Sequence, residues 1–129
     1  AGKTLPEILT AAGVPGFLAL EGRVGEGVRC EKTVIATGGS MVYSASAMEN
    51  LRAESVAVWL DTEPEELACR ISAAADRGIA AEPGTSIADI YAARRPLYEK
   101  YADIRIACAG GIDHVVRQVR DALSRYGRG

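Results

Sequence analysis

Three arginines and a pair of glycines are the residues of this sequence best suited to chemistry on a small charged molecule. Gly38 and Gly39 follow an apolar run, and a glycine turn there lets backbone amides approach a polar ligand closely. Arg70, Arg77 and Arg94 could hold a carboxylate or a phosphate, because a guanidinium presents a fork of donors. Arg77 lies among small residues, and an arginine in such a loop could swing onto transferring phosphates. Taken alone, each arginine is better explained as a solvated surface residue.

Other candidate residues have simpler interpretations. Residues 1–4 (AGKT) look like the end of a phosphate-binding loop, but no strand or glycine-bearing loop precedes them. The glycines from Gly22 to Gly27 match a glycine-rich loop only loosely, and we predict a frayed helix end there. Asp61 could bind a metal or a substrate, although its place before a capping sequence favours a role at a helix start. His114, the only histidine, is expected to be a surface or packing residue.

Composition and charge exclude several classes of function. The 129 residues carry 15 basic and 17 acidic side chains, whereas a non-specific nucleic-acid binder needs a basic excess. No apolar run reaches the roughly 18 to 20 residues that span a bilayer, so we expect a cytoplasmic protein with no membrane partner. Cys30, Cys69 and Cys108 form no CxxC pair. We expect them to be reduced thiols, and we predict no metal site in this chain.

Alternating apolar runs and helix caps predict the elements that must position these residues. Buried strands are predicted over 33–37, 55–61 and 104–109, which are rich in β-branched and apolar residues. Residues 75–86 are rich in Gly, Pro and small residues, which is typical of a mobile loop that closes over a substrate. Helices are predicted over 5–12, from Pro15, from Ser44 or Ser46 to Arg52, and from Thr62 through Ile71. A further helix is predicted to begin at Ser86 and to be kinked or broken at Pro96. The last predicted helix has its cap at Asp113 and carries one buried apolar stripe.

Read in order, these segments resemble the shikimate kinases, which are small P-loop kinases. The resemblance covers about residues 2–124 and implies an α/β fold: a parallel sheet in three layers, with helices on both faces, in a single domain over 1–129. Its motifs are Gly2-Lys3-Thr4 with Glu7-Ile8, Phe17 with Glu21, the segment from Val34 to Ser40 (VIATGGS), the segment from Val58 to Asp61 (VWLD), Arg70 with Arg77, and the segment from Arg94 to Tyr98 (RRPLY).

The resemblance implies an enzyme that transfers the γ-phosphoryl group of ATP, with Mg²⁺, to a hydroxyl of shikimate or a similar small carboxylated alcohol. In the family this step belongs to aromatic amino acid biosynthesis. Substrate binding is implied for Gly38, Gly39, Glu21 and Arg94, with Arg94 pairing with the carboxylate. Arg77 would be the catalytic arginine of a lid loop over about 75–86, reaching the phosphates. Arg70 would pack against the adenine.

The sequence also departs from the family pattern. Leu18 stands where the family has the first of two substrate-binding arginines, and Ser40 stands in place of a third glycine. The family's first strand, Walker A loop and first helix would all precede residue 1. We therefore expect an N-terminally incomplete domain that, without the phosphate-binding loop, should not transfer phosphate on its own, and a complementing segment in place of the first strand. The alternative hypothesis is a non-catalytic kinase-like protein that binds a metabolite or a partner protein.

Overall fold

Helices precede, separate and follow two short strands along the chain, in agreement with the predicted α/β class. The computed structural model describes residues 2–72 and 79–127. In that part the elements follow in the order α1 (Leu5–Gly27), η1 (Met41–Tyr43, a 3-10 turn), α2 (Ala45–Arg52), β1 (Val58–Asp61), α3 (Pro64–Ser72), α4 (Ile87–Tyr101), β2 (Ile104–Ala107) and α5 (Ile112–Tyr126).

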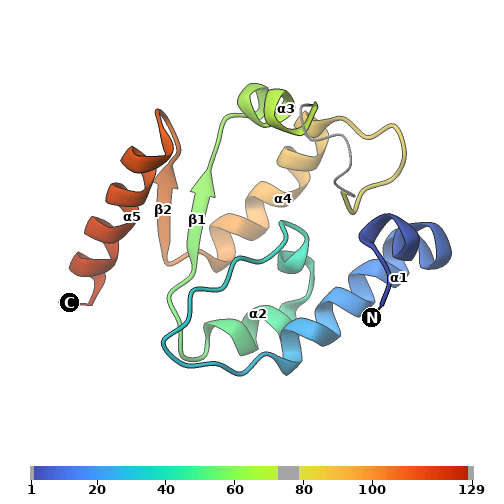
Figure 1. The fold of residues 1–129 in the computed structure, drawn as a ribbon, viewed down its shortest axis with the longest axis horizontal. Coiled ribbons are helices and arrows are strands. Elements are labelled where there is room, and N and C mark those ends of the chain that lie inside the picture. Colours follow the sequence, from blue (N-terminus) through green and yellow to red (C-terminus); the bar gives the residue numbers. More distant parts are fainter. Residues whose placement is uncertain (1, 73–78, 128–129) are drawn as a thin grey trace.

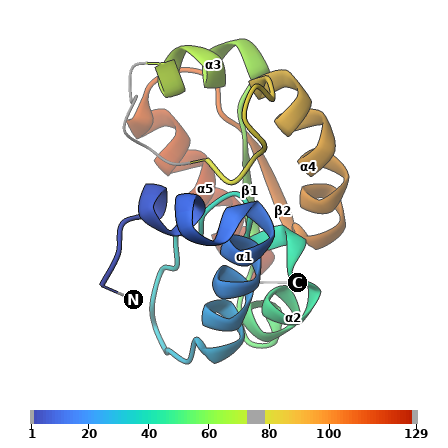
Figure 2. The same cartoon turned by 90° about the vertical axis from the view of Figure 1, so that its right-hand side faces the viewer.

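The two strands form a small parallel sheet. β1 pairs with β2 with Val58 opposite Ile104, and α4 and α5 lie on opposite sides of the pair (Figure 1, Figure 2). Both strands are shorter than predicted, and β1 is not buried on both faces. Trp59 is 8% exposed under α4, where its ring lies 5.8 Å from that of Tyr98, whereas Leu60 on the other face is 54% exposed. One face of the sheet is therefore much better covered than the other.

The predicted strand over 33–37 is not formed. Every residue from 29 to 39 is exposed, and Val34 is 96% exposed. A strand needs a neighbour to pair with its backbone N–H and C=O groups, and the sheet in the described residues contains only β1 and β2. The composition of 33–37 suits a strand, but pairing decides whether one forms.

Helix α1 bends where its sequence predicts an interruption. Gly13 has φ 68° and ψ −179°, a conformation that separates the two predicted helical stretches. The predicted capping box is confirmed, since the Thr4 hydroxyl accepts from the Glu7 N–H and the Glu7 carboxylate accepts from the Thr4 N–H at 2.6 Å. The capping residues therefore predict the start of α1 correctly from the sequence.

The far end of α1 is not frayed, which corrects the prediction for Gly22 to Gly27. The helix continues to Gly27, and both Gly22 and Gly25 are buried. A Cβ on Gly25 would lie 2.7 Å from the Cβ of Ala47, so the glycine allows α2 to approach closely. These glycines serve helix packing, which sequence spacing alone did not distinguish from flexibility.

Helix α4 is not broken at Pro96. It begins after Ser86, whose hydroxyl accepts from the Asp89 N–H at 3.1 Å as predicted, and it continues to Tyr101. The turn after the proline is held by packing, because Leu97, Tyr98 and Tyr101 lie in or against the main hydrophobic cluster. Tertiary contacts therefore outweigh the backbone cost of the proline.

Helix α5 differs from its prediction at its start and in its burial. Gly111 is the N-cap, with its carbonyl accepting from the N–H groups of His114 and Val115, while Asp113 lies in the first turn. The predicted buried stripe is only partly covered, since no residue of α5 is buried and Val116 is 50% exposed. The helix contacts β2 along one side only (Figure 1).

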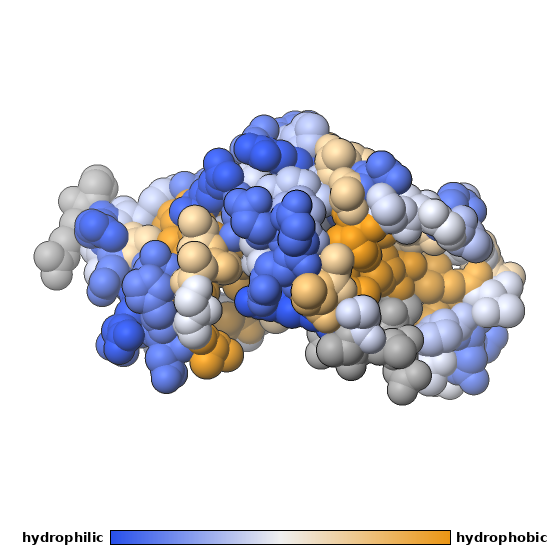
Figure 3. Space-filling model, turned by 90° about the horizontal axis from the view of Figure 1, so that it is seen from above, coloured by the Kyte–Doolittle hydropathy of each residue, from blue (hydrophilic) through white to orange (hydrophobic). Residues whose placement is uncertain are grey.

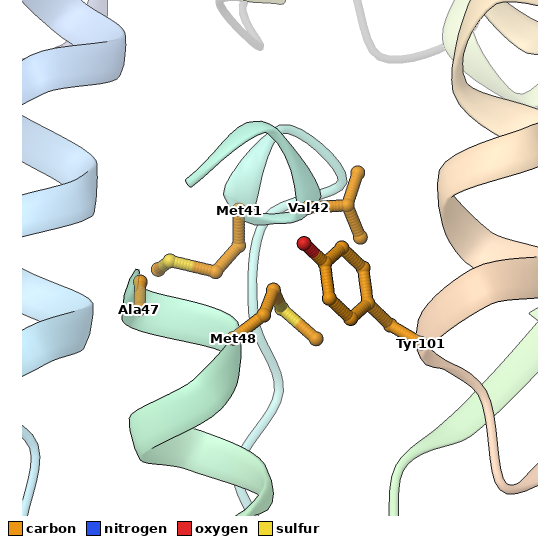
Figure 4. Packing of buried hydrophobic residues seen from close by; sticks show 5 residues of the cluster. All are labelled: Met41, Val42, Ala47, Met48 and Tyr101. Atoms are coloured by element: carbon orange, nitrogen blue, oxygen red, sulfur yellow. The ribbon is translucent and has the colours of Figure 1, made fainter. Parts of the chain in front are cut away.

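The hydrophobic core lies where η1, α2 and α4 meet. Met41, Val42, Ala47, Met48 and Tyr101 point toward one another in this cluster (Figure 4), and Ala47 is fully buried. Elsewhere hydrophobic surface is open to solvent in a hollow between polar side chains (Figure 3). The core that positions Gly38, Gly39 and α4 is therefore small.

Asp103 fixes the loop before β1 to the loop before β2. Its carboxylate accepts from the Ala57 N–H and from Arg52, both at 2.8 Å. Burial on its own would raise the pKa of Asp103, but these two donors outweigh it, so the pKa lies below its ordinary value. The ionised carboxylate therefore contributes to the stability of the fold.

We expect Asp103→Asn to lower the free energy of unfolding by about 1–3 kcal/mol at pH 7. A lowered folded pKa means that this contribution is present above the unfolded pKa of about 3.9 and is lost as the pH falls through the lower folded value. Urea unfolding at pH 7 and in acid measures both effects, with the exposed Glu54→Gln as control. A difference between Asp103→Asn and the parent that persists unchanged in acid would contradict this assignment.

Candidate functional site

The turn at Gly38 and Gly39 meets side chains from α1 and α4. A Cβ on Gly38 would lie 2.8 Å from Oε1 of Glu21, and a Cβ on Gly39 would lie 2.8 Å from Nη1 of Arg94. The Tyr98 hydroxyl donates to the Gly39 carbonyl at 2.7 Å. The structure therefore brings together the four residues for which the sequence predicts substrate binding: Gly38, Gly39, Glu21 and Arg94.

Arg94 is a buried cation whose hydrogen bonds are incomplete. It is 9% exposed, its Nη2 donates to the Ala80 carbonyl at 3.2 Å, and its guanidinium carbon lies 5.7 Å from the centre of the Tyr43 ring. Its Nε finds no hydrogen-bond partner among the described residues. A buried guanidinium in this state favours an anionic ligand that can complete its hydrogen bonds.

Two polar side chains hold the glycine turn in place. Buried Ser40 donates a short hydrogen bond to Oε2 of Glu21, which joins the turn to α1. Burial raises the pKa of Tyr98, and this effect exceeds the opposing influence of the Arg94 guanidinium. The Tyr98 hydroxyl therefore stays protonated and remains a donor to Gly39.

A cavity of about 210 Å³ opens beside Arg94. It is smaller than the roughly 300–1,000 Å³ typical of sites for drug-sized ligands, so it suits a small metabolite. Leu18 lies in its wall with Arg94, as the resemblance implies for the position of the missing arginine. The apolar lining consists mainly of Val14, Leu18, Ile90 and Ala93, and the charged lining consists of Arg94, Glu82 and Asp89.

The other candidate residues lie apart from this cluster or outside the described part of the chain. Arg70 is exposed on α3 and pairs with Glu66 at 2.8 Å. Arg77 and most of the first half of the predicted lid loop lie outside the described residues, so both stay predictions. His114 is exposed in the first turn of α5, as expected of a surface residue.

Asp61 joins elements of the sheet and α4 and does not cap the helix that follows it. Its buried carboxylate accepts from the Tyr91 hydroxyl at 2.9 Å and from Nε of Arg105 at 2.9 Å. The Arg105 guanidinium also lies 4.7 Å from the Trp59 ring. Asp61 therefore ties β1 to β2 and α4, which corrects the expected role at the start of a helix.

Sequence reasoning did not identify Tyr43, Glu82 and Asp89 as residues of the site. Their positions depend on how η1, the segment from 79 to 86 and the first turn of α4 fold toward α1, which no local pattern encodes. Tyr98 had a usable signal, because it follows Arg94 by four residues and so lies on the same face of the helix.

The described residues contain neither a metal-binding cluster nor a membrane-spanning helix. Across residues 2–72 and 79–127, no three side chains of His, Cys, Asp or Glu lie together as a metal site requires. In the same part of the chain, no helix is both long and apolar enough to cross a membrane.

The sequence of the chain is similar to proteins of one known family. A family model described as shikimate kinase matches residues 1–124. The chain is 34% identical to the shikimate kinase of Symbiobacterium thermophilum, covering 98% of this chain and 76% of that protein. It is also 34% identical to the shikimate kinase of Rhodopseudomonas palustris, covering 83% of this chain and 54% of that protein.

A third relative has a different name. The chain is 30% identical to human threonine synthase-like 1, covering 95% of this chain but only 17% of that much longer protein. The chain thus spans about half of one of these three relatives and less than a fifth of another. The family match covers nearly the whole sequence and agrees with the resemblance found in its motifs: the chain belongs to the shikimate kinase family.

Proposed function

We propose that this protein is a cytoplasmic phosphotransferase that transfers the γ-phosphoryl group of ATP to a hydroxyl of shikimate or a similar small carboxylated alcohol. The observation that carries the proposal is the buried Arg94, which lines a cavity of about 210 Å³ and whose Nε has no hydrogen-bond partner among the described residues. Its guanidinium would pair with the carboxylate of the acceptor. Family membership supplies the type of reaction.

The glycine turn would orient the acceptor's hydroxyl groups. Side chains on Gly38 or Gly39 would collide with Glu21, Arg94 or Tyr98, so these positions keep backbone exposed at the site. The Glu21 carboxylate, held by Ser40, can accept a hydrogen bond from a substrate hydroxyl. Holding the acceptor in one orientation is a large part of phosphoryl-transfer catalysis, since the chemistry depends on in-line positioning.

ATP and Mg²⁺ come to this proposal from the family. When bound, they supply the phosphoryl group and neutralise its charge. The described residues do not fit them well, because Arg70 is exposed and engaged with Glu66 and no cluster of metal-ligating side chains is found in the described ranges. The described site therefore fits the acceptor alcohol, and we assign to the chain's residues only the binding and orientation of that acceptor. The catalytic role of Arg77, reaching the phosphates of ATP, is part of the proposal.

A coupled assay of ADP release with ATP, Mg²⁺ and shikimate tests the proposed function. Turnover that depends on shikimate and is abolished by Arg94→Ala is the expected result. Carboxylate binding without turnover would favour the alternative, a non-catalytic kinase-like protein that binds a metabolite. The absence of both binding and turnover would contradict the assignment of this cavity as the acceptor site.

Leu18 limits how well the pocket can hold shikimate. Leu18→Arg would place a second guanidinium in the wall that contains Arg94, and we expect shikimate to bind more than about tenfold more tightly. Isothermal titration measures the change. Val24→Arg, at an exposed position of α1 outside the cavity, serves as the control. An unchanged dissociation constant in Leu18→Arg would count against the correspondence between Leu18 and the family's arginine.

We also propose that a further strand completes the sheet between β1 and the exposed loop segment 33–38. Val34 and Leu60 are 96% and 54% exposed, which leaves apolar surface for such a strand to cover. The accessible surface is 8887 Å², against roughly 6,600 Å² for a compact protein of this mass. The native protein should therefore have an intact mass well above 13.6 kDa, or carry a bound polypeptide. A lone 13.6 kDa species with fast amide exchange over 33–37 would contradict this.

A further inference from the structure

The buried hydroxyl of Ser40 is bonded to a neighbouring helix rather than to its own turn. Ser40 is the N-cap of η1, yet its side chain makes no capping hydrogen bond, and its hydroxyl donates to Oε2 of Glu21 on α1 instead. Its backbone has φ −84° and ψ −9°, which lies in the right-handed region that any residue adopts. Backbone strain therefore does not select the residue at this position, and the feature that distinguishes serine here is its hydroxyl.

The Glu21 carboxylate has one oxygen held by that hydroxyl and the other beside the glycine turn. Among residues 2–72 and 79–127, Ser40 is the one side chain that donates to this carboxylate, and no lysine or arginine forms an ion pair with it. Oε1 lies so close to Gly38 that a Cβ there would be 2.8 Å away. A free glutamate side chain samples many rotamers, so a bond to one oxygen fixes where the other lies. The Ser40 hydroxyl therefore aims Oε1 at the turn.

Position 18 lies three residues before Glu21 on the same face of α1. Residues three apart on a helix are neighbours, so a cation at position 18 would reach the Glu21 carboxylate and could hold it by an ion pair. Leu18 has no polar atom to do this, and its side chain lies in the wall of the Arg94 cavity. This chain has leucine where the family pattern has an arginine, and Ser40 where that pattern has a glycine. The two departures meet at one side chain, Glu21.

We infer that Ser40 is a positioning residue of the acceptor site, whose hydroxyl holds Glu21 in place of a cation at position 18. Ser40 supplies the orientation of Glu21 that Leu18 leaves unfixed, while the carboxylate of the acceptor depends on Arg94. The two departures from the family pattern are therefore a matched pair. The inference rests on the proposed function in one respect, namely that Glu21 meets a hydroxyl group of the acceptor.

Removing the Ser40 hydroxyl in three backgrounds tests the inference. Isothermal titration measures the affinity for shikimate of Ser40→Ala alone and of the same change combined with Leu18→Arg or with Glu21→Ala. In the parent protein we expect Ser40→Ala to weaken binding about three- to tenfold, because Glu21 is then no longer held. In the other two backgrounds the same change should cost less than about twofold, since an arginine holds Glu21 in one and no carboxylate is left to hold in the other.

Ser46 provides the matched control for the lost hydroxyl. Its side chain also donates a short hydrogen bond to a glutamate of α1, Glu26, but Ser46 is exposed and lies outside the Arg94 cavity. Ser46→Ala should leave the affinity for shikimate unchanged in all three backgrounds. Circular dichroism and urea unfolding of each variant show whether the fold is retained, so that a loss of folded protein is not counted as a loss of affinity.

The outcomes separate this inference from the proposed function. If Ser40→Ala leaves the affinity of the parent unchanged, or if its cost persists in either of the other backgrounds, the inference is overturned. The proposed function stands in that case, provided that Arg94→Ala still abolishes the binding of shikimate. If the parent protein binds no shikimate, the acceptor site itself is wrongly placed and both proposals fail.

Discussion

Replacing Arg94 with alanine is expected to weaken the binding of a carboxylate ligand about 30- to 1,000-fold. The side chain is 9% exposed and its Nε has no partner among the described residues, so a bound carboxylate would complete its hydrogen bonds. Loss of two charge-assisted hydrogen bonds costs about 2–4 kcal/mol of binding free energy. The affinity of Arg94→Lys for the carboxylate should lie between those of the parent protein and Arg94→Ala, because an ammonium group lacks the planar fork of a guanidinium.

The next residue in the chain provides a matched control for this prediction. Arg95 lies on the same helix, but it is exposed, pairs with Glu99 at 2.9 Å and lies outside the cavity. Titration of the two alanine variants with the same carboxylate should show a large loss for Arg94→Ala and little for Arg95→Ala. Equal losses in the two variants, or none in either, would mean that the buried guanidinium is not the anchor. Far-ultraviolet circular dichroism of both variants shows whether the fold is retained.

Substituting Gly25 with alanine is expected to lower the free energy of unfolding by about 1–3 kcal/mol. The new methyl group would lie 2.7 Å from the Cβ of fully buried Ala47 and 2.7 Å from Sδ of Met41. Met41 can move, but Ala47 has no side-chain freedom, so α1 and α2 must separate. This strain falls on the hydrophobic cluster that supports the glycine turn (Figure 4).

The end of the same helix supplies the control for the Gly25 prediction. A Cβ on Gly27 would meet nothing within 4 Å, so Gly27→Ala adds only helix propensity. It should leave stability unchanged or raise it by up to about 1 kcal/mol. The midpoint of thermal unfolding should therefore fall for Gly25→Ala. For Gly27→Ala it should stay the same or rise. A Gly25→Ala protein as stable as Gly27→Ala would contradict close packing of α1 on α2.

Elements whose signals are local were predicted well from the sequence. The Thr4–Glu7 capping box, the Ser44 cap of α2 and the Ser86 cap of α4 all lie where expected, because each depends on side chains within three residues. The bend at Gly13 is predicted by the sequence in the same way. These signals needed no knowledge of the rest of the fold.

Features that depend on distant partners were predicted less well. Residues 33–37 have the composition of a strand, yet strand formation requires a neighbour that is not among the described residues. The glycines around Gly25 predict a frayed helix end, but Gly25 packs against Ala47, and Pro96 predicts a break that core packing prevents. In the site, the family motifs name Gly38, Gly39, Glu21 and Arg94, which the structure places near one another, whereas Glu82 and Asp89 reach the Arg94 cavity only through tertiary packing.

The identity of the phosphorylated product tests the central claim most directly. The protein is incubated with ATP, Mg²⁺ and a small carboxylated alcohol, and the mixture is followed by phosphorus NMR. The account predicts a new phosphomonoester resonance that grows in equal amount with ADP, depends on the acceptor and is absent with Arg94→Ala. Equal release of ADP and inorganic phosphate without a phosphomonoester, or a phosphomonoester that forms undiminished in Arg94→Ala, would contradict it.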